Sequence, residues 1–417
     1  MMQNNRGRTL AYCWVTLLLL GMSLWGCQEA QSGQIAYVGS DGNVYITSAD
    51  LQTTTQLTHD ATARIEGTGR SYHRLAWSPK GQLAYAAVER AGEQASSTIY
   101  VTDFDESVPP IVGGSREHFV IYMNWAAGSC HDDGCSRFAY LIEENERIAL
   151  RTVDVTSAEN QLAGTGWPFY FSWSADGEHM AWHRNGGILD NSAAMFSTFD
   201  LAAQQTTDLP MLPGLQVAPA FSPMGEGLLL VSAENNLILI HNNTQTTITT
   251  GGTGDIAFSW SPDGTQIAYA VRRQLREPFY DAIHIYDVTT KASRRIVDVG
   301  LRTQGFFWAP DSRQLAYIQW LPLGAEDGWM QWRIVDTETS IDRGFEPFNP
   351  TPQFRFIMAS FNQYAQSHRL WSPNSRYLLF TERSGETDDT IWMLDTSSDS
   401  PNGIWVAEGS LAFWSWR

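Results

Sequence analysis

The sequence predicts an all-β fold, a β-propeller of eight four-stranded blades, with seven blades as the alternative. Three observations lead to this prediction. A Trp-Ser-Pro phrase recurs along the 417 residues, short β-forming segments follow each copy, and the two ends of the chain read as complementary parts of one unit. A period of about 40 to 50 residues is typical of one four-stranded propeller blade.

The repeated phrase is clearest in three places, Ala76–Tyr85, Ser172–Gly177 and Ser259–Tyr269. Weaker copies lie at Trp125, Phe221, Trp308 and Trp371, and an eighth lies at Trp416. The steps from Trp77 to Trp371 are 48, 48, 48, 39, 48 and 63 residues. This regularity indicates one repeated structural unit rather than several unrelated domains.

Each unit is expected to contain four strands. An apolar strand ends at the Trp, and Ser-Pro-Asp-Gly then makes a tight turn in which Pro fixes φ and Gly accepts a positive φ. An alternating strand such as Gln266–Ala270 follows, and after it a third strand that usually ends in Asp. Because an Asp there can bond its own backbone and begin the next turn, we assign these carboxylates to turns rather than to catalysis.

This internal pattern resembles the WD-like propeller repeats of the TolB family over nearly all of the chain after residue 32. The resemblance implies the propeller alone. The TolB family is known for an α/β domain ahead of its ring, and no room is left for one here because the first expected strand begins near Gly33. A role in the TolB envelope complex is therefore not carried over.

The two ends of the chain are expected to close the ring. Residues 34–58 read as a second, third and fourth strand without a first, whereas Ala412–Arg417 reads as a first strand with nothing after it. Pairing them makes one blade from both termini and removes an exposed sheet edge. We therefore expect a single domain over residues 33–417, with seven blades if the short Phe221 unit merges with a neighbour.

The first 27 residues read as an export signal. Two arginines precede an apolar stretch from Leu10 to Trp25, which is short for a membrane span. The stretch ends in Leu-Trp-Gly-Cys, which resembles the bacterial lipoprotein signal, so we expect a lipid on Cys27 and a short tether over residues 28–32. The expected location is the outer side of the cytoplasmic membrane or the outer membrane, and plain secretion or an uncleaved anchor is the alternative.

Composition narrows the possible partners. The chain has 45 Asp and Glu against 27 Lys and Arg, a formal net charge of -18 at pH 7. This balance argues against nucleic acid, because phosphate binding needs clustered cations. We also expect a monomer without a cofactor that touches the membrane only through its lipid.

Cys130 and Cys135 are the two cysteines outside the leader. In an exported chain they can form a loop disulfide, or they can bind a metal together with His131 and its neighbouring Asp residues. A zinc site would need a second ligand pair, so we predict the disulfide. His179 and His183 share one face of a strand, and we assign them to packing or surface roles rather than to a metal site.

The favoured function is a non-enzymatic binding or scaffold propeller of the cell envelope that recognises a protein or a cell-wall or carbohydrate ligand. The sequence contains no nucleophile elbow, P-loop, dinucleotide fingerprint or His-Glu-x-x-His motif. The alternative is a glycan hydrolase or lyase with its site at the mouth of the central channel, because the fold alone does not exclude an enzyme.

One face of the ring is expected to bind the partner. Length variation concentrates in the connections between second and third strands and between blades, which share a face because strands alternate in direction. The longest run, residues 343–368, is rich in aromatic residues, which often dominate binding energy at interfaces. The predicted contact residues are Trp329, Trp332, Phe348, Phe354 and Tyr364. The alternative is that this insertion packs as a mini-core over one blade.

The lipid anchor makes a direct prediction. We expect the parent protein to partition into the detergent phase and the Cys27→Ala variant to remain in the aqueous phase, because the acyl chains supply the membrane affinity. Phase-partitioning of both proteins followed by immunoblotting checks this, and equal partitioning of the two would remove the lipoprotein interpretation.

Overall fold

The computed structural model describes residues 33–62, 68–102, 111–131, 134–186, 193–214, 217–225, 227–242, 244–252, 255–272, 279–298, 300, 302–322, 328–383, 385, 389–398 and 403–417. The expected leader and tether, including Cys27, lie outside the described residues. None of the helices in the described part of the chain has the length and hydrophobicity needed to cross a bilayer.

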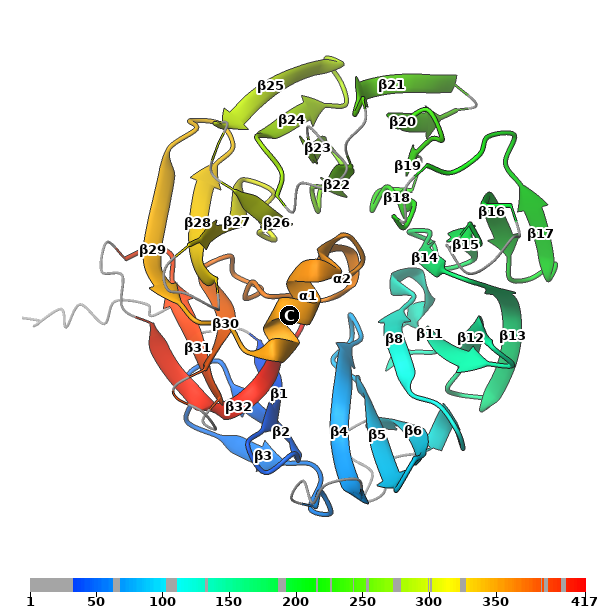
Figure 1. Cartoon of the computed structure of the whole chain (residues 1–417), viewed down its shortest axis with the longest axis vertical. Coiled ribbons are helices and arrows are strands. Elements are labelled where there is room, and N and C mark those ends of the chain that lie inside the picture. Colours follow the sequence, from blue (N-terminus) through cyan, green and yellow to red (C-terminus); the bar gives the residue numbers. More distant parts are fainter. Residues whose placement is uncertain are drawn as a thin grey trace, which may run out of the picture. The chain divides into compact units, whose positions relative to one another are not determined.

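The chain from residue 33 onwards folds into antiparallel sheets arranged around a central axis (Figure 1). Six of these sheets contain four strands each. They are β4 (Thr68–Trp77), β5 (Leu83–Ala91), β6 (Gln94–Thr102) and β7 (Ile111–Ser115); β8 (Val120–Trp125), β11 (Arg137–Glu144), β12 (Arg147–Asp154) and β13 (Glu159–Gly166); β14 (Phe169–Trp173), β15 (His179–Arg184), β16 (Met195–Asp200) and β17 (Gln205–Asp208); β18 (Ala220–Phe221), β19 (Leu228–Val231), β20 (Asn236–His241) and β21 (Thr244–Thr250); β22 (Ile256–Trp260), β23 (Gln266–Val271), β24 (Ile283–Asp287) and β25 (Ala292–Val297); β26 (Thr303–Trp308), β27 (Gln314–Leu321), β28 (Trp329–Asp336) and β29 (Asp342–Phe348).

The seventh sheet has six strands in the order β3-β2-β1-β32-β31-β30. Its members are β1 (Gln34–Gly39), β2 (Val44–Ser48), β3 (Thr54–Gln56), β30 (Tyr377–Arg383), β31 (Asp389–Asp395) and β32 (Ile404–Trp414). A small hairpin of β9 (Cys130–His131) and β10 (Gly134–Cys135) follows the short helix η1 (Ala127–Ser129). The protein is thus an all-β propeller with antiparallel blades, as the repeats predicted.

The prediction of eight separate blades is wrong, because the described strands form seven blades. The first half of β32 pairs with β31 and its second half pairs with β1, so the last repeat and the terminal unit share one continuous sheet. The strand expected at Trp371 is reduced to an isolated bridge with Leu378, since a helix occupies the residues just before it. The Phe221 unit, where we had placed the alternative merger, keeps its own sheet.

The ring is closed by pairing of the two ends of the domain. Ile35 of β1 lies opposite Trp414 of β32, and the register continues to Val38 opposite Leu411. Trp414, which is completely buried, therefore holds the position that the repeat analysis had given to Trp416. Closure by the terminal strands is confirmed, and only the residue at the repeat position changes.

Adjacent repeats are joined by hydrogen bonds from the repeated indoles. In each of six repeats, the Trp Nε1 donates to the backbone carbonyl of the residue just before the repeat position of the preceding unit. The pairs are Trp77 with Phe413, Trp125 with Ala76, Trp173 with Asn124, Trp260 with Ala220, Trp308 with Ser259 and Trp371 with Phe307, at 2.9–3.2 Å. Phe221 has no such donor. The repeated Trp thus joins neighbouring sheets everywhere except where Phe221 replaces it.

The repeated turns have the expected local structure. Gly177 and Gly264 both adopt φ of 70°, which their Ser-x-Asp-Gly turns require. Asp287 and Asp336 accept backbone hydrogen bonds from the turns that follow them, at 2.7 Å from Thr290 and 2.8 Å from Thr339. The carboxylates that end the third strands in the described residues therefore serve as turn caps.

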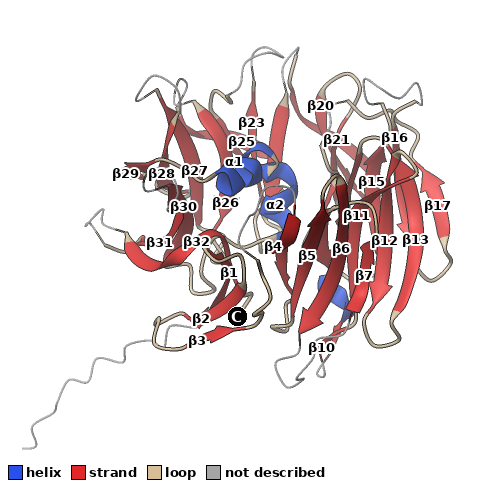
Figure 2. Cartoon of the chain, turned by 60° about the horizontal axis from the view of Figure 1, so that its bottom comes forward, coloured by secondary structure: helices blue, strands red, loops and turns tan. Residues whose placement is uncertain are grey.

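Two helices occupy the centre of the ring. They are α1 (Pro352–Ala359) and α2 (Phe361–Ser367), and both lie on the axis among the inner strands (Figures 1 and 2). Thr351 begins α1 by accepting a hydrogen bond from the amide of Phe354, and Pro352 follows it, where a missing N–H costs nothing. The aromatic insertion thus begins as strand β29 and continues as two helices rather than as a loop.

Candidate functional site: an axial cavity beside a helical plug

The helices α1 and α2 form a plug that several blades hold in place. Phe361 packs against Phe306 and Tyr280, with ring centroids 5.2 and 6.0 Å apart. On the other side, the Gln363 Nε2 donates to the carbonyl of Phe171 at 2.7 Å. The insertion therefore fills the centre of the ring, and the expectation of a mini-core over one blade is corrected to a core shared by several.

Four of the five predicted contact residues belong to this core. Trp332, Phe348, Phe354 and Tyr364 are 0%, 2%, 1% and 4% exposed. Phe354 lies between Trp332 and Phe348, with ring centroids 6.1 and 5.7 Å away. Trp329 opens strand β28 and is partly exposed. The four buried rings stabilise the plug, and none of them is exposed on the outer surface of the described structure.

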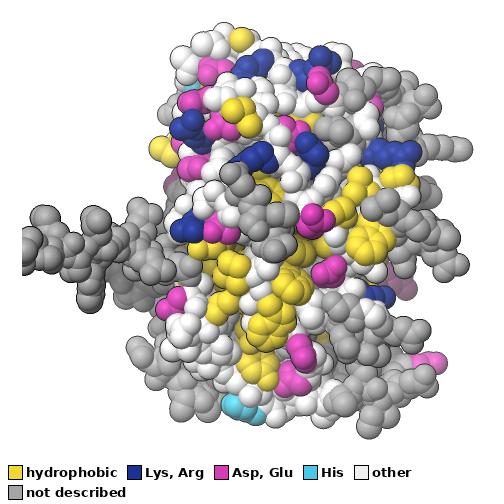
Figure 3. Space-filling model, turned by 90° about the vertical axis from the view of Figure 1, so that its left-hand side faces the viewer, with side chains coloured by type: hydrophobic (Ala, Val, Ile, Leu, Met, Phe, Trp, Pro, Cys, Tyr) yellow, Lys and Arg dark blue, Asp and Glu magenta, His cyan; other side chains and the backbone are white. Residues whose placement is uncertain are grey.

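Exposed apolar side chains lie elsewhere. On the side of the ring formed by β29 and β31, apolar side chains gather between charged ones (Figure 3). Ile341, Ile404 and Trp405, which belong to this part of the chain, are 63%, 37% and 52% exposed. The sequence analysis did not single out Trp405, because its position in the sequence does not distinguish an exposed tryptophan from the buried ones.

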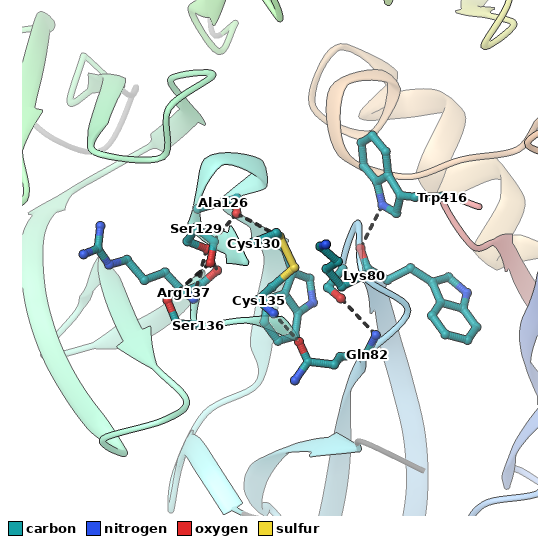
Figure 4. Close-up of a disulfide and its surroundings, with 12 residues drawn as sticks. Lys80, Gln82, Ala126, Ser129, Cys130, Cys135, Ser136, Arg137 and Trp416 are labelled. Atoms are coloured by element: carbon teal, nitrogen blue, oxygen red, sulfur yellow. Dashed lines mark hydrogen bonds between the residues drawn. A yellow bond between two sulfur atoms is a disulfide. The ribbon is translucent and has the colours of Figure 1, made fainter. Parts of the chain in front are cut away.

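The predicted disulfide between Cys130 and Cys135 is present (Figure 4). It closes the hairpin of β9 and β10, and the amide of Cys135 donates to the Gln82 Oε1 of the neighbouring blade at 2.7 Å. Nearby, the Trp416 Nε1 donates to the carbonyl of Trp77 at 2.9 Å. The bridge thus stabilises a contact between blades rather than a ligand site.

The two histidines on β15 have different surroundings. His179 is partly exposed near Asp176 and Asp200, whereas His183 is 1% exposed. Among the described residues no group of three His, Cys, Asp or Glu side chains could hold a metal ion.

The candidate site is a cavity of about 730 Å³ beside the plug. We call the side of the ring with the Trp-Ser-Pro turns the turn face and the opposite side the loop face. The cavity opens on the loop face, because its lining includes the β1–β2 turn at Asp41–Asn43 and the inter-blade residue Ala61. The plug contributes Gln353, Phe356 and Tyr364. A smaller cavity of about 250 Å³ lies among the repeated Trp residues on the turn face.

Arg74 supplies the one cation among the described residues that line the larger cavity. It sits in β4 at a register shift between His73 and Leu75, and its φ of 56° is unusual for a residue other than Gly. Its guanidinium lies over the ring of Phe356, 4.7 Å from the centroid. Such bulges are frequent next to functional sites, where they redirect a side chain.

Of the other titratable groups that line the cavity, the two histidines are neutral and the Asp41 carboxylate is already hydrogen-bonded within the protein. Burial, with a smaller contribution from the charge of Arg74, lowers the pKa of His73 and of His368 to about 3, so both are neutral at pH 7. Burial alone would raise the pKa of Asp41, but hydrogen bonds from Asn43 and Tyr45 outweigh it and hold that pKa below its usual value. Arg74 and the Asp41 carboxylate therefore carry charge in the cavity.

Comparisons with known proteins define the fold and not the activity. No protein-family model matches the chain, and no curated protein matches it. Among solved structures, it is similar to an oligogalacturonate lyase in complex with manganese, with 13% identity and a TM-score of 0.54 over 88% of this chain and 98% of that one. It is also similar to prolyl endopeptidase, with 12% identity and a TM-score of 0.56, covering 84% of this chain and 50% of that chain.

TolB from Acinetobacter baumannii is also among the similar structures, with 15% identity and a TM-score of 0.41 over 79% of this chain and 81% of that one. The antiparallel sheets around a central axis define the class of the protein as a β-propeller. The propeller that the TolB-like repeats implied is confirmed by this architecture.

The plug makes a testable prediction about stability. Replacing the buried Phe354 by Ala should lower the free energy of unfolding by about 3–5 kcal/mol, because it leaves a cavity in the aromatic core. The matched control is Phe356→Ala, two residues away and 41% exposed, which should cost about 1 kcal/mol or less. Urea unfolding followed by Trp fluorescence measures both, and equal losses would show that the insertion is not a core.

Proposed function

We propose that the protein is a lipid-anchored, non-enzymatic binding propeller of the cell envelope, which holds its ligand in the axial cavity on the loop face. The observation that carries this proposal is the cavity itself. Its volume of about 730 Å³ falls in the range of small-molecule sites, and its lining combines apolar side chains with a few polar groups and Arg74.

The plug favours binding over passage through the ring. Tyr364 and His368 line the larger cavity, and the smaller cavity on the turn face also reaches His368, so the residues of the plug separate the two. Both side chains are at least nine-tenths buried. A ligand that enters from the loop face would therefore meet a closed floor, which is the geometry of a binding pocket. The loop face remains the proposed recognition face. Binding is now proposed to occur in the cavity on that face rather than on exposed aromatic side chains.

The alternative is a glycan hydrolase or lyase with its site at the channel mouth. The carboxylates that line the cavity in the described residues are Asp41 and Asp389. Asp41 is held in its own turn, and Asp389 lies 3.6 Å from the Arg383 Nε, so neither is placed as a free acid or base. Binding is therefore the better-supported function, and an envelope protein or a cell-wall or carbohydrate molecule is the proposed ligand class.

A lipid anchor on Cys27 would favour an orientation in which the pocket faces away from the membrane. Gly33 lies on the turn face, where an added Cβ would come within 2.9 Å of Pro373 in a repeated turn. The five residues 28–32 separate Cys27 from Gly33, so the two can lie up to about 20 Å apart when this segment is fully extended. A lipid on Cys27 would keep the turn face near the bilayer and leave the loop face free for ligand.

Blocking the cavity tests this proposal. Ser71 lines it, and Ser71→Trp should fill part of the space and abolish retention of the envelope component that the parent protein binds. Thr207→Trp, on the exposed outer strand β17, is the matched control and should bind like the parent. Immobilised full-length proteins are incubated with envelope extract and the retained components are identified. If Ser71→Trp retains the same components as the parent, the cavity is not the binding site.

A further inference from the structure

We propose that the axial cavity selects a saccharide that bears a carboxylate, and that Arg74 holds this carboxylate. The inference rests on the proposed binding function and adds the chemistry of the ligand. It depends on three features of the cavity: a fixed cation without an ionic partner among the described residues, carboxylates that already have partners, and polar side chains that suit sugar hydroxyls.

Arg74 is held in place before any ligand arrives. Its Nε donates to the carbonyl of Ile121 at 2.7 Å, and the Phe356 ring supports the guanidinium plane. No ion pair or hydrogen bond joins its Nη1 or Nη2 to another of the described residues. A planar guanidinium with unused N–H groups is the best protein partner for a carboxylate, because two parallel hydrogen bonds can form.

The backbone at Arg74 supports a functional role. A residue other than Gly at φ of 56° is strained, and the surrounding structure must hold it there. The register shift in β4 leaves Arg74 outside the ladder, between His73 opposite Ala86 and Leu75 opposite Tyr85. The strained bulge is what places the guanidinium among the residues that line the cavity.

The cavity carboxylates do not neutralise Arg74. The Asp41 Oδ1 accepts from the amide of Asn43, and its Oδ2 accepts from the Asn43 side chain and from the Tyr45 hydroxyl. Asp389 is near Arg383. Arg74 can therefore pair with a ligand anion, whereas the ionised Asp41 disfavours a doubly charged group such as a phosphate. One monovalent carboxylate fits this balance.

The remaining lining suits a sugar. Ser71 and Ser410 contribute hydroxyl groups, and Gln353 contributes a side-chain amide. Phe356 and Ile357 add apolar surface from the plug. Mixed hydroxyl, amide and apolar contacts match an oligosaccharide better than an extended acidic peptide, which would bring several charges.

Titration calorimetry on the full-length protein in detergent tests the inference without any variant. The probes are a trisaccharide of uronic acid, a disaccharide that contains muramic acid, the methyl ester of each, and an acidic tripeptide. We expect at least one acidic sugar to bind about tenfold or more tighter than its own methyl ester, because a charge-assisted pair is lost in the ester. Binding of the uronic acid trisaccharide would indicate a uronate polymer as the source of the ligand, and binding of the muramic acid disaccharide would indicate peptidoglycan. Equal affinity for the acid and the ester, preference for the peptide, or no binding of either acidic sugar would overturn the inference.

Variants then assign the effect to Arg74. Arg74→Gln should remove the preference for the acid over its methyl ester. Arg295→Gln, at an exposed arginine on β25, is the matched control and should behave like the parent. If Arg74→Gln keeps the preference, another residue provides it and the assignment is wrong. The two proposals can fail separately. If the acid preference is absent but Ser71→Trp still loses the envelope component that the parent retains, the proposed binding function stands and only the ligand chemistry is wrong.

Discussion

The hydrogen bond that six of the repeated indoles donate to the preceding unit is the interaction on which the ring depends. Six buried Trp donors reach a carbonyl in the neighbouring sheet, at the same position each time. A buried donor and acceptor that lost each other would both remain unsatisfied, so the relative placement of adjacent sheets is strongly specified. With the angle between blades fixed, closure by β1 and β32 and the width of the central channel follow.

The fold was predictable because one short phrase encodes both a turn and a contact. In Trp-Ser-Pro-Asp-Gly, the Pro and Gly fix the turn and the Trp provides the contact between blades. The number of blades was not predictable from the same phrase. The step of 63 residues between Trp308 and Trp371 contains two helices, and the strand expected at Trp371 does not form. Sharing of β32 between two repeats depends on pairing and not on spacing.

The candidate site could not be predicted from local sequence. The aromatic run at residues 343–368 was visible, but sequence does not reveal that its helices turn into the channel and bury Phe354 and Tyr364. Arg74 carried no signal, because its bulge arises from the register of β4 against β5. The cavity combines β1–β2, β4 and α1, which are up to about three hundred residues apart, so only the closed ring brings them together.

If the repeated indole bonds hold the ring together, loss of one of them should destabilise the domain, and equilibrium unfolding of Trp125→Phe measures this. This change keeps an aromatic ring but removes the 2.9 Å hydrogen bond to the carbonyl of Ala76. The account predicts a loss of about 1–3 kcal/mol in the free energy of unfolding, whereas Trp405→Phe, at a position 52% exposed, should change it by about 0.5 kcal/mol or less. Equal stability of the two variants would contradict the account.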